Sequence, residues 1–297
     1  MTGPDTPDVP DTADGAPDEV VVRLERAPGA DAGPDAVDDG IRLLVLDRPA
    51  SLNAMNGALV QQLYDRIEEV RADSAARVVI LTGEGRGFCS GLDLQQSPPT
   101  GLSATEGRGR MQRGMDVQQQ IAGLVPALRS LRVPVVAAVN GAAAGGGLAL
   151  ALASDVRIAA ESAKFNVAFV KLGLSGCDIG VSWLLPRWIG ASRAFELMLT
   201  GRFVLADEAE RIGLVTRTVP DDQLMDAALE TARLIAANSP TGVWMTKEVM
   251  WSQLEVGSLQ AGIDLENRTQ ILTSFTEDMG EAVMSFLERR PPEFRNR

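Results

Sequence analysis

The feature of the sequence that most restricts the fold is a pair of short apolar runs, each of which is followed by small residues. Residues 77–82 read RVVILT and residues 135–139 read VVAAV. Runs of this length, rich in β-branched residues and bounded by glycine, are typical of strands buried on both faces. Segments with helical periodicity lie before and after them, so strand and helix alternate along the chain. We therefore expect an α/β fold with a parallel sheet.

The rest of the chain predicts further elements of both kinds. Strands are expected over residues 20–24, 41–46, 156–159 and 214–219, the first two as a hairpin. Helices are expected over residues 59–70, 111–131 with a perturbation at Pro126, 148–153, 191–199, 206–212, 221–237, 243–254, 259–272 and 277–289. The segment 83–91 is expected to be a loop.

The distribution of charge and of large apolar residues predicts three parts. Residues 1–40 hold nine Asp and two Glu but only two Arg, and the rest of the chain contributes −3 to the net charge of −12. Because residues 1–19 have almost no large apolar side chains, we expect a disordered acidic tail there. Residues 27–40 have a similar composition and predict a flexible loop. We expect an α/β core over 20–205 and a helical C-terminal region over 206–297.

The composition excludes several kinds of chemistry and partner. The chain has no histidine, so it cannot form a Ser–His–Asp triad, a Cys–His dyad or a His-ligated metal site. Its two cysteines are too few for a disulfide framework. No apolar run is long enough to span a membrane, no signal peptide is visible and no basic stripe suggests nucleic acid. We expect a cytoplasmic protein that binds neither membrane nor nucleic acid.

Two small-residue segments are the candidates for a site. Gly87–Leu94 reads GFCSGLDL after the first apolar strand, and Asn140–Gly147 reads NGAAAGGG after the second and opens a helix. N–H groups from two such loops can converge on one oxygen and form an oxyanion hole, with Ser90 and Gly146 as donors. Alternatively, the glycines only permit close packing of helix on strand. Neither the dinucleotide motif G-x-G-x-x-G nor a P-loop is present.

The order of several motifs makes the chain resemble the crotonase superfamily, the enoyl-CoA hydratase/isomerase group. These are LDRP with NAMN at 46–56, RVVILTGEGRGFCSGLDL, PVVAAVNGAAAGGGLALALASDVRIA, EAERIGLV at 208–215 and SFLERRP at 285–291. The resemblance covers about residues 41–292. It implies a spiral of ββα repeats with a helical C-terminal trimerisation region, and homotrimers often paired into hexamers. It also implies coenzyme A as part of an acyl-CoA thioester substrate, with no prosthetic group.

The resemblance also implies roles for individual residues. The N–H groups of Ser90 and Gly146 would bind the thioester carbonyl and stabilise its enolate. Gly91, Leu92 and Asp93 would join them in contacting the CoA thioester, and Leu92–Leu94 would border the adenine.

The hydratase pattern fails at two positions. Where hydratases of this family place two glutamates, this chain has Ala149 and Phe169, which cannot titrate. The best replacement is Asp178, which lies where other members of the superfamily place a catalytic aspartate. It could act as the single acid and base, or it could cap the helix expected to start near Gly180.

The remaining candidates have two interpretations each. The position of Asp155 after a helix indicates that it forms a cap or a turn. Cys177 is expected to be a small core residue and not a nucleophile. Lys247 and the pair Arg289–Arg290 could meet CoA phosphates or be solvated.

Three functional hypotheses follow. The first is enolate formation with Asp178 as acid and base, which suits double-bond isomerisation better than water addition because one group can remove and return a proton. The second is a non-catalytic acyl-CoA-binding protein that has lost its acids. The third is another enolate reaction, such as decarboxylation or thioester hydrolysis.

Overall fold

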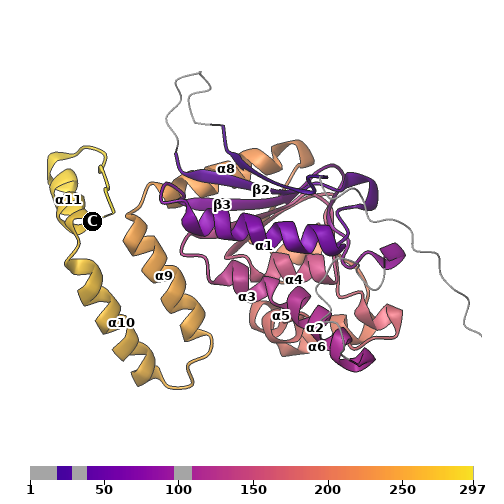
Figure 1. The fold of residues 1–297 in the computed structure, drawn as a ribbon. Helices are drawn as coiled ribbons and strands as arrows, with labels where there is room; N and C mark the ends of the chain where they lie inside the picture. The colour runs from indigo at the N-terminus through magenta and orange to yellow at the C-terminus, as the bar shows by residue number, and fades with distance from the viewer. Residues whose placement is uncertain (1–18, 29–38, 97–108, 297) are drawn as a thin grey trace, which may run out of the picture.

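Two sheets form the body of the molecule in a computed structural model that describes residues 19–28, 39–96 and 109–296 (Figure 1). The larger sheet has the order β1 (Val22–Arg26), β2 (Ile41–Leu46), β3 (Val78–Gly83), β5 (Val135–Val139), β7 (Val156–Ala160) and β10 (Arg217–Val219). The smaller has the order β4 (Gly87–Cys89), β6 (Ala142–Ala144), β8 (Lys164–Asn166) and β9 (Val204–Leu205). The larger sheet is parallel except for the β1–β2 hairpin, as predicted.

Three successive turns of chain each add one strand to each sheet. Strands β3, β5 and β7 enter the larger sheet, and each is followed at once by a strand of the smaller sheet, β4, β6 or β8. Helices then return the chain: α2 (Arg110–Ala122) with α3 (Leu124–Arg129), α4 (Gly146–Ala153), and α5 (Val181–Ile189). This arrangement confirms the predicted spiral of ββα repeats.

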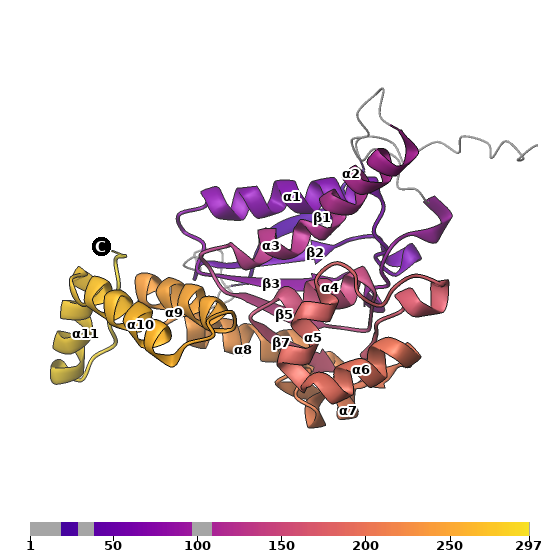
Figure 2. The ribbon, with the colours of Figure 1, turned by 90° about the horizontal axis from the view of Figure 1, so that it is seen from below.

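The helix α4 is the buried centre of this arrangement. All eight of its residues are buried, because its sequence GGLALALA is apolar on every side. Helices α3 and α5 pack against it, α1 (Gly57–Ala72) packs on α3 on the same side of the larger sheet, and α8 (Leu224–Ala236) covers the other side (Figure 2). The N-terminus of α4 therefore opens inside the molecule and not at its surface.

Two local predictions need correction. The expected loop 83–91 contains β4, and the loop before α4 contains β6, because three-residue strands are too short to show periodicity. The expected helix 111–131 is interrupted at Gly123. Tyr64 Oη donates to the carbonyl of Gln120 there and lies so close that a Cβ on Gly123 would overlap it. Pro126 lies in the first turn of α3, where its missing N–H has no helical partner to lose.

The C-terminal helices divide differently from the predicted boundary at residue 205. Helices α6 (Ala191–Thr200) and α7 (Ala206–Arg211) lead into β10, which pairs with β7, and α8 packs on the sheet, so both β10 and α8 belong to the core. The helices that stand beside the core are α9 (Pro240–Gln253), α10 (Leu259–Ser274) and α11 (Glu277–Glu288) (Figure 1). Nearly all of the predicted tail 1–19, and most of the loop 27–40, lies outside the described residues. Within the described part, no helix is long and apolar enough to cross a membrane.

A buried ion pair fastens α9 to the core. Lys247 Nζ lies 2.9 Å from Asp155 Oδ2 and donates to the carbonyl of Val133. The same carboxylate accepts the Val135 N–H and the indole N–H of Trp251. Lys247 is therefore committed to the fold and not available to a CoA phosphate, and Asp155 joins strand to helix instead of capping one.

Candidate functional site

The two small-residue loops predicted to form a site meet at the N-terminus of α4. Strands β4 and β6 pair in parallel and bring their ends together. Gly91 has a φ of +96°, and a Cβ placed on it would lie 2.9 Å from the carbonyl oxygen of Ala144 and 3.6 Å from the nitrogen of Gly146. A Cβ on Gly147 would overlap the carbonyl of Cys89. Glycine at 91 and 147 is thus what allows the loops to approach so closely.

The N–H of Gly146 points out of the helix into this meeting place. Gly146 is the first residue of α4, so its N–H has no helical acceptor, and the structure records no other partner for it among the described residues. The carbonyl of Gly145 accepts the N–H of Ala149 along the helix. Because the carbonyl and N–H of one trans peptide point in opposite directions, the Gly146 N–H is directed away from α4. The positive end of the helix dipole lies at the same point.

The second predicted donor, Ser90, is already occupied. Its N–H donates to the carbonyl of Leu52 at 3.0 Å, and its hydroxyl donates to the carbonyl of Ser51. An N–H held in this way is not free for a ligand. The prediction of Ser90 as donor is therefore not supported by the geometry, because the carbonyl of Leu52 already accepts its N–H.

The N–H of Leu92 is oriented as the predicted donor should be. Met55 donates its N–H to the carbonyl of Gly91 at 2.7 Å and accepts the N–H of Asp93 at 2.9 Å. Since the carbonyl of Gly91 faces Met55, the Leu92 N–H in the same peptide faces the opposite way. No partner for it is recorded within the part of the chain that the structure describes. Leu92 and Gly146 are thus the two free donors at the junction of the loops.

Arg48 fixes the loop that carries Leu92. Its guanidinium lies 3.0 Å from the carboxylate of Asp93, which is 8% exposed, and it also donates to the carbonyl of Ala54. Asp93 was predicted to contact CoA, but its carboxylate is engaged by Arg48 and by the N–H of Gln95. Its role in this arrangement is to hold the loop.

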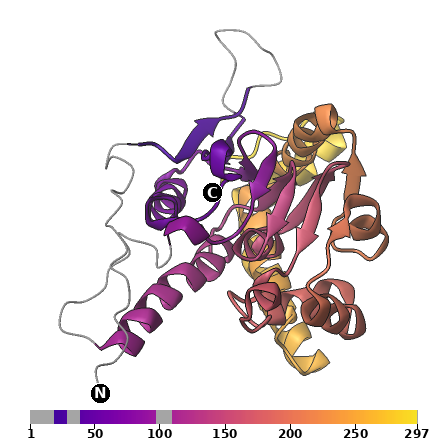
Figure 3. The same ribbon diagram turned by 90° about the vertical axis from the view of Figure 1, so that its right-hand side faces the viewer.

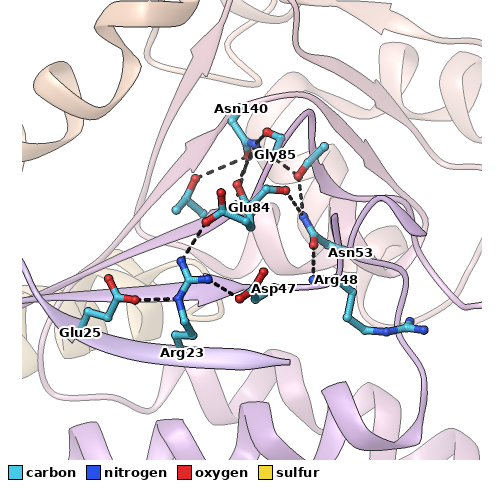
Figure 4. A network of polar contacts seen from close by, with 11 residues as sticks. Arg23, Glu25, Asp47, Arg48, Asn53, Glu84, Gly85 and Asn140 are labelled. Carbon is cyan, nitrogen blue, oxygen red and sulfur yellow. Dashed lines mark hydrogen bonds and ion pairs between the residues drawn. The ribbon is translucent and has the colours of Figure 1, made fainter. Parts of the chain in front are cut away.

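Two asparagines support the turn that leads into β4 (Figure 4). The Asn53 side chain is fully buried and donates to the carbonyls of Glu84 and Gly87. Asn140 donates to the carbonyls of Gly83 and Gly85 at 2.8 Å each. These amides bind carbonyls of the segment that joins β3 to β4, so the asparagines of both sequence motifs support the loop that leads to the site.

Apolar side chains line the space in front of Gly146. A Cβ on Gly146 would lie 2.9 Å from Met55 Sδ and 3.5 Å from Ile179 Cδ1. A Cβ on Gly145 would lie 3.3 Å from Cε1 of Phe169. Met55 and Ile179 were missed by the sequence reasoning; Met55 stands between the two asparagines of the NAMN motif, and its position there was the one available signal.

The two positions expected to hold glutamates are apolar and buried. Ala149 is fully buried within α4, and Phe169, at the start of the 3₁₀ turn Phe169–Leu172, is 8% exposed. Neither offers a titratable group, so the departure from the hydratase pattern is a property of the folded site.

Asp178 lies directly before Ile179 in the same wall. Its side chain is half-buried, and its Oδ1 accepts the N–H of Ile179 at 2.8 Å and the amide N–H of Gln118 at 2.5 Å. The N-cap of α5 is Gly180, without a side-chain cap, and only the backbone carbonyl of Asp178 accepts from Val181. Its carboxylate is therefore not the N-cap of α5.

Ile179 has a φ of +47°. This conformation is costly for a β-branched residue, on the order of 1–3 kcal/mol, and such strain is concentrated at functional sites. In this conformation Ile179 Cδ1 lies next to Gly146, and Asp178 directly precedes it.

The two cysteines lie in different environments. Burial raises the pKa of the Cys89 thiol to about 12, so it stays protonated at neutral pH. Cys177 is exposed, so its interpretation as a small core residue is wrong. Within the described ranges, no cluster of His, Cys, Asp or Glu is arranged to hold a metal ion.

The arginines predicted as possible phosphate ligands lie directly after α11. Arg290 is paired with Glu281 at 2.5 Å and with Glu288 at 2.7 Å, so its charge is neutralised locally. Arg289 ends the helix with a φ of +56°.

The chain is similar to known proteins along most of its length. Residues 36–297 match the enoyl-CoA hydratase/isomerase family profile. A probable enoyl-CoA hydratase of Mycobacterium tuberculosis is 43% identical over 255 residues, which cover 86% of this chain and 89% of the relative. The 1,2-epoxyphenylacetyl-CoA isomerase of Escherichia coli is 40% identical over 260 residues, covering 88% and 96%. The crystal structure of a probable enoyl-CoA hydratase/isomerase from Mycobacterium abscessus superimposes with a TM-score of 0.83 at 36% identity, covering 93% and 99%.

Proposed function

Because the chain belongs to the enoyl-CoA hydratase/isomerase family, we propose that it converts an acyl-CoA thioester through an enolate held by the N–H groups of Leu92 and Gly146. The reaction that this site suits best is migration of a double bond, with Asp178 carrying the proton. The chain is an enzyme of this family, and CoA enters as part of the substrate.

The observation that carries the proposal is the pair of free donors at the junction of the loops. The N–H of Leu92 faces away from Met55 and that of Gly146 faces out of α4, on segments that the close approach of Gly91 to Gly146 brings together. Two donors directed at one oxygen stabilise the negative charge that develops on a thioester carbonyl when its α-proton leaves. Ser90 keeps a supporting part, since its bond to Leu52 holds the loop in place.

The apolar surroundings favour isomerisation over hydration. Water addition needs a group that activates water, and Ala149 and Phe169 provide none. The relative named 1,2-epoxyphenylacetyl-CoA isomerase supports a rearrangement without net water addition. A single carboxylate can serve both proton transfers of an isomerisation.

In the proposed step Asp178 alone removes the proton and returns it. Its carboxylate takes the proton from C2 of a 3-enoyl thioester, and the electron pair of that C–H bond moves into a dienolate whose oxygen is held by the two N–H groups. The protonated Asp178 then returns the proton to C4, and the double bond closes between C2 and C3. Substrate and product are isomers, and the enzyme ends unchanged.

We expect the protein to exchange the α-protons of phenylacetyl-CoA with deuterium from heavy water. This substrate suits the test because its phenyl group makes the α-proton more acidic, and exchange requires only enolate formation. We also expect turnover of trans-3-hexenoyl-CoA to the 2-enoyl product, without measurable hydration of trans-2-hexenoyl-CoA. Mass spectrometry of the recovered thioesters reports exchange and hydration, which change the mass, and the ultraviolet absorbance of the conjugated 2-enoyl thioester reports isomerisation, which does not. Rapid hydration without exchange would overturn the proposal.

A second candidate function is acyl-CoA binding without catalysis. The fully apolar replacements at Ala149 and Phe169 favour it, because the site has lost both family acids. Calorimetry with phenylacetyl-CoA together with the exchange assay would separate the two functions. A binding protein would bind the thioester and leave its α-protons unexchanged.

We also propose that the chain assembles as a homotrimer, or as a hexamer of two trimers. The helices α10 and α11 stand away from the core and expose many large apolar side chains: Leu259, Ile263, Ile271, Leu272, Phe275, Met279, Val283, Met284, Phe286 and Leu287. A surface of this kind marks a contact with another chain.

Sedimentation should therefore report three or six copies per particle. The double variant Phe275→Asp with Phe286→Asp should shift the particle towards the monomer, since the added charges would be buried at the contact. A wild-type protein that sediments as a monomer would contradict this proposal.

A further inference from the structure

Helix α2 reaches the proposed acid and base from a distant part of the chain. It projects beyond the sheets and the other helices (Figure 2 and Figure 3). Gln118 on this helix donates its side-chain amide N–H to Asp178 Oδ1 at 2.5 Å, across 60 residues of sequence.

The two oxygens of Asp178 are in different environments. Oδ1 accepts two hydrogen bonds, one from Gln118 and one from the N–H of Ile179. For Oδ2 the structure records no partner among the described residues. Two donors on one oxygen fix the plane of the carboxylate and leave the lone pairs of the other oxygen for the substrate.

The backbone alone cannot fix this carboxylate. The donor from Ile179 belongs to the next residue in the chain, so it restrains one torsion of Asp178 but comes from the same loop. Gln118 is the contact that ties the loop to a separate helix. Removing it would leave Oδ1 with only the local bond and let the carboxylate rotate.

We propose that Gln118 is a positioning residue that anchors Oδ1 of Asp178 and so makes Oδ2 the atom that carries the proton. This inference rests on the proposed function, in which Asp178 is the acid and base. Gln118 takes no proton itself and touches the reaction only through Asp178.

Three substitutions at Gln118 distinguish the effect of its hydrogen-bond donor from the effect of its side-chain volume. Gln118→Leu removes the donor, Gln118→Glu keeps the shape but replaces the donor by an acceptor, and Gln118→Lys restores a donor. The matched control is Gln119→Leu, because Gln119 is an exposed glutamine on the same helix whose side chain makes no recorded bond. The assay is isomerisation of trans-3-hexenoyl-CoA, with kcat and KM measured separately.

A hydrogen bond to a charged group at an exposed position predicts a loss in kcat of about tenfold for Gln118→Leu, and a larger loss for Gln118→Glu. KM should change by less than about twofold, because the thioester is held by backbone groups elsewhere. Gln118→Lys should recover most of the activity, and Gln119→Leu should match the wild type. In the Asp178→Asn background, Gln118→Leu should have no further effect on residual α-proton exchange.

The outcomes distinguish this inference from the function on which it rests. If Asp178→Asn keeps full activity, the role of Asp178 fails and the positioning role fails with it. If Asp178→Asn is inactive while Gln118→Leu and Gln118→Glu both retain wild-type kcat, only the positioning role is overturned. A loss at Gln118 that persists equally in the Asp178→Asn background would also overturn it, because Gln118 would then act by another route.

Discussion

Replacing Gly146 with proline should slow enolate formation about 10²–10³-fold, while replacing it with alanine should slow it far less. Gly146 is the first residue of α4, a position where proline is well tolerated because its N–H has no helical acceptor. Proline removes that N–H, and its ring occupies the space into which the N–H points. The loss of one oxyanion-hole donor predicts a fall in the rate of α-proton exchange of about 10²–10³-fold.

Gly146→Ala is the matched control for this change. It adds the same Cβ, 2.9 Å from Met55 Sδ, but keeps the N–H. Met55 is a flexible side chain whose end can move, so the alanine variant should lose far less activity than the proline variant. Exchange rates with saturating phenylacetyl-CoA, measured by mass spectrometry, compare the two. Circular dichroism of both variants checks that α4 is intact. Equal exchange by the alanine and proline variants would show that the Gly146 N–H is not a donor.

Asp178→Asn should remove catalysis and preserve binding. Asparagine is nearly isosteric and can still accept at Oδ1 from Gln118 and from the N–H of Ile179, so the loop should keep its conformation. It cannot accept the α-proton. Loss of a general base predicts a fall of about 10²–10⁴-fold in isomerisation and exchange. Calorimetry should find affinity for phenylacetyl-CoA close to that of the wild type.

Cys177→Ser is the control for Asp178→Asn, since it changes the adjacent exposed residue without altering the carboxylate. It should behave as the wild type in both assays. If Asp178→Asn exchanges α-protons as fast as the wild type, another group is the base, and Asp178 only shapes the loop. If both the wild type and the variant bind without exchange, the non-catalytic alternative is correct.

Much of the fold was readable from the sequence because it depends on patterns that are local. Buried strands such as Ile41–Leu46 and Val135–Val139 were predicted at their observed bounds, since continuous apolar runs fit a sheet covered on both sides. The alternation of strand and helix fixed the α/β class, and the order of the motifs indicated the ββα spiral. The same reading placed two loops beside each other and recognised Ala149 and Phe169 as apolar where acids were expected.

The tertiary structure decided the chemistry within those loops. Which N–H is free depends on where each neighbouring carbonyl points, and that was settled by Leu52 and Met55, more than thirty residues upstream. The bond from Gln118 to Asp178 crosses 60 residues. Lys247 could be a phosphate ligand by sequence and became part of a buried ion pair because α9 packs on Asp155. Sequence patterns report which face of an element is apolar, but they carry no record of peptide orientation or of side chains that meet only when distant segments pack together.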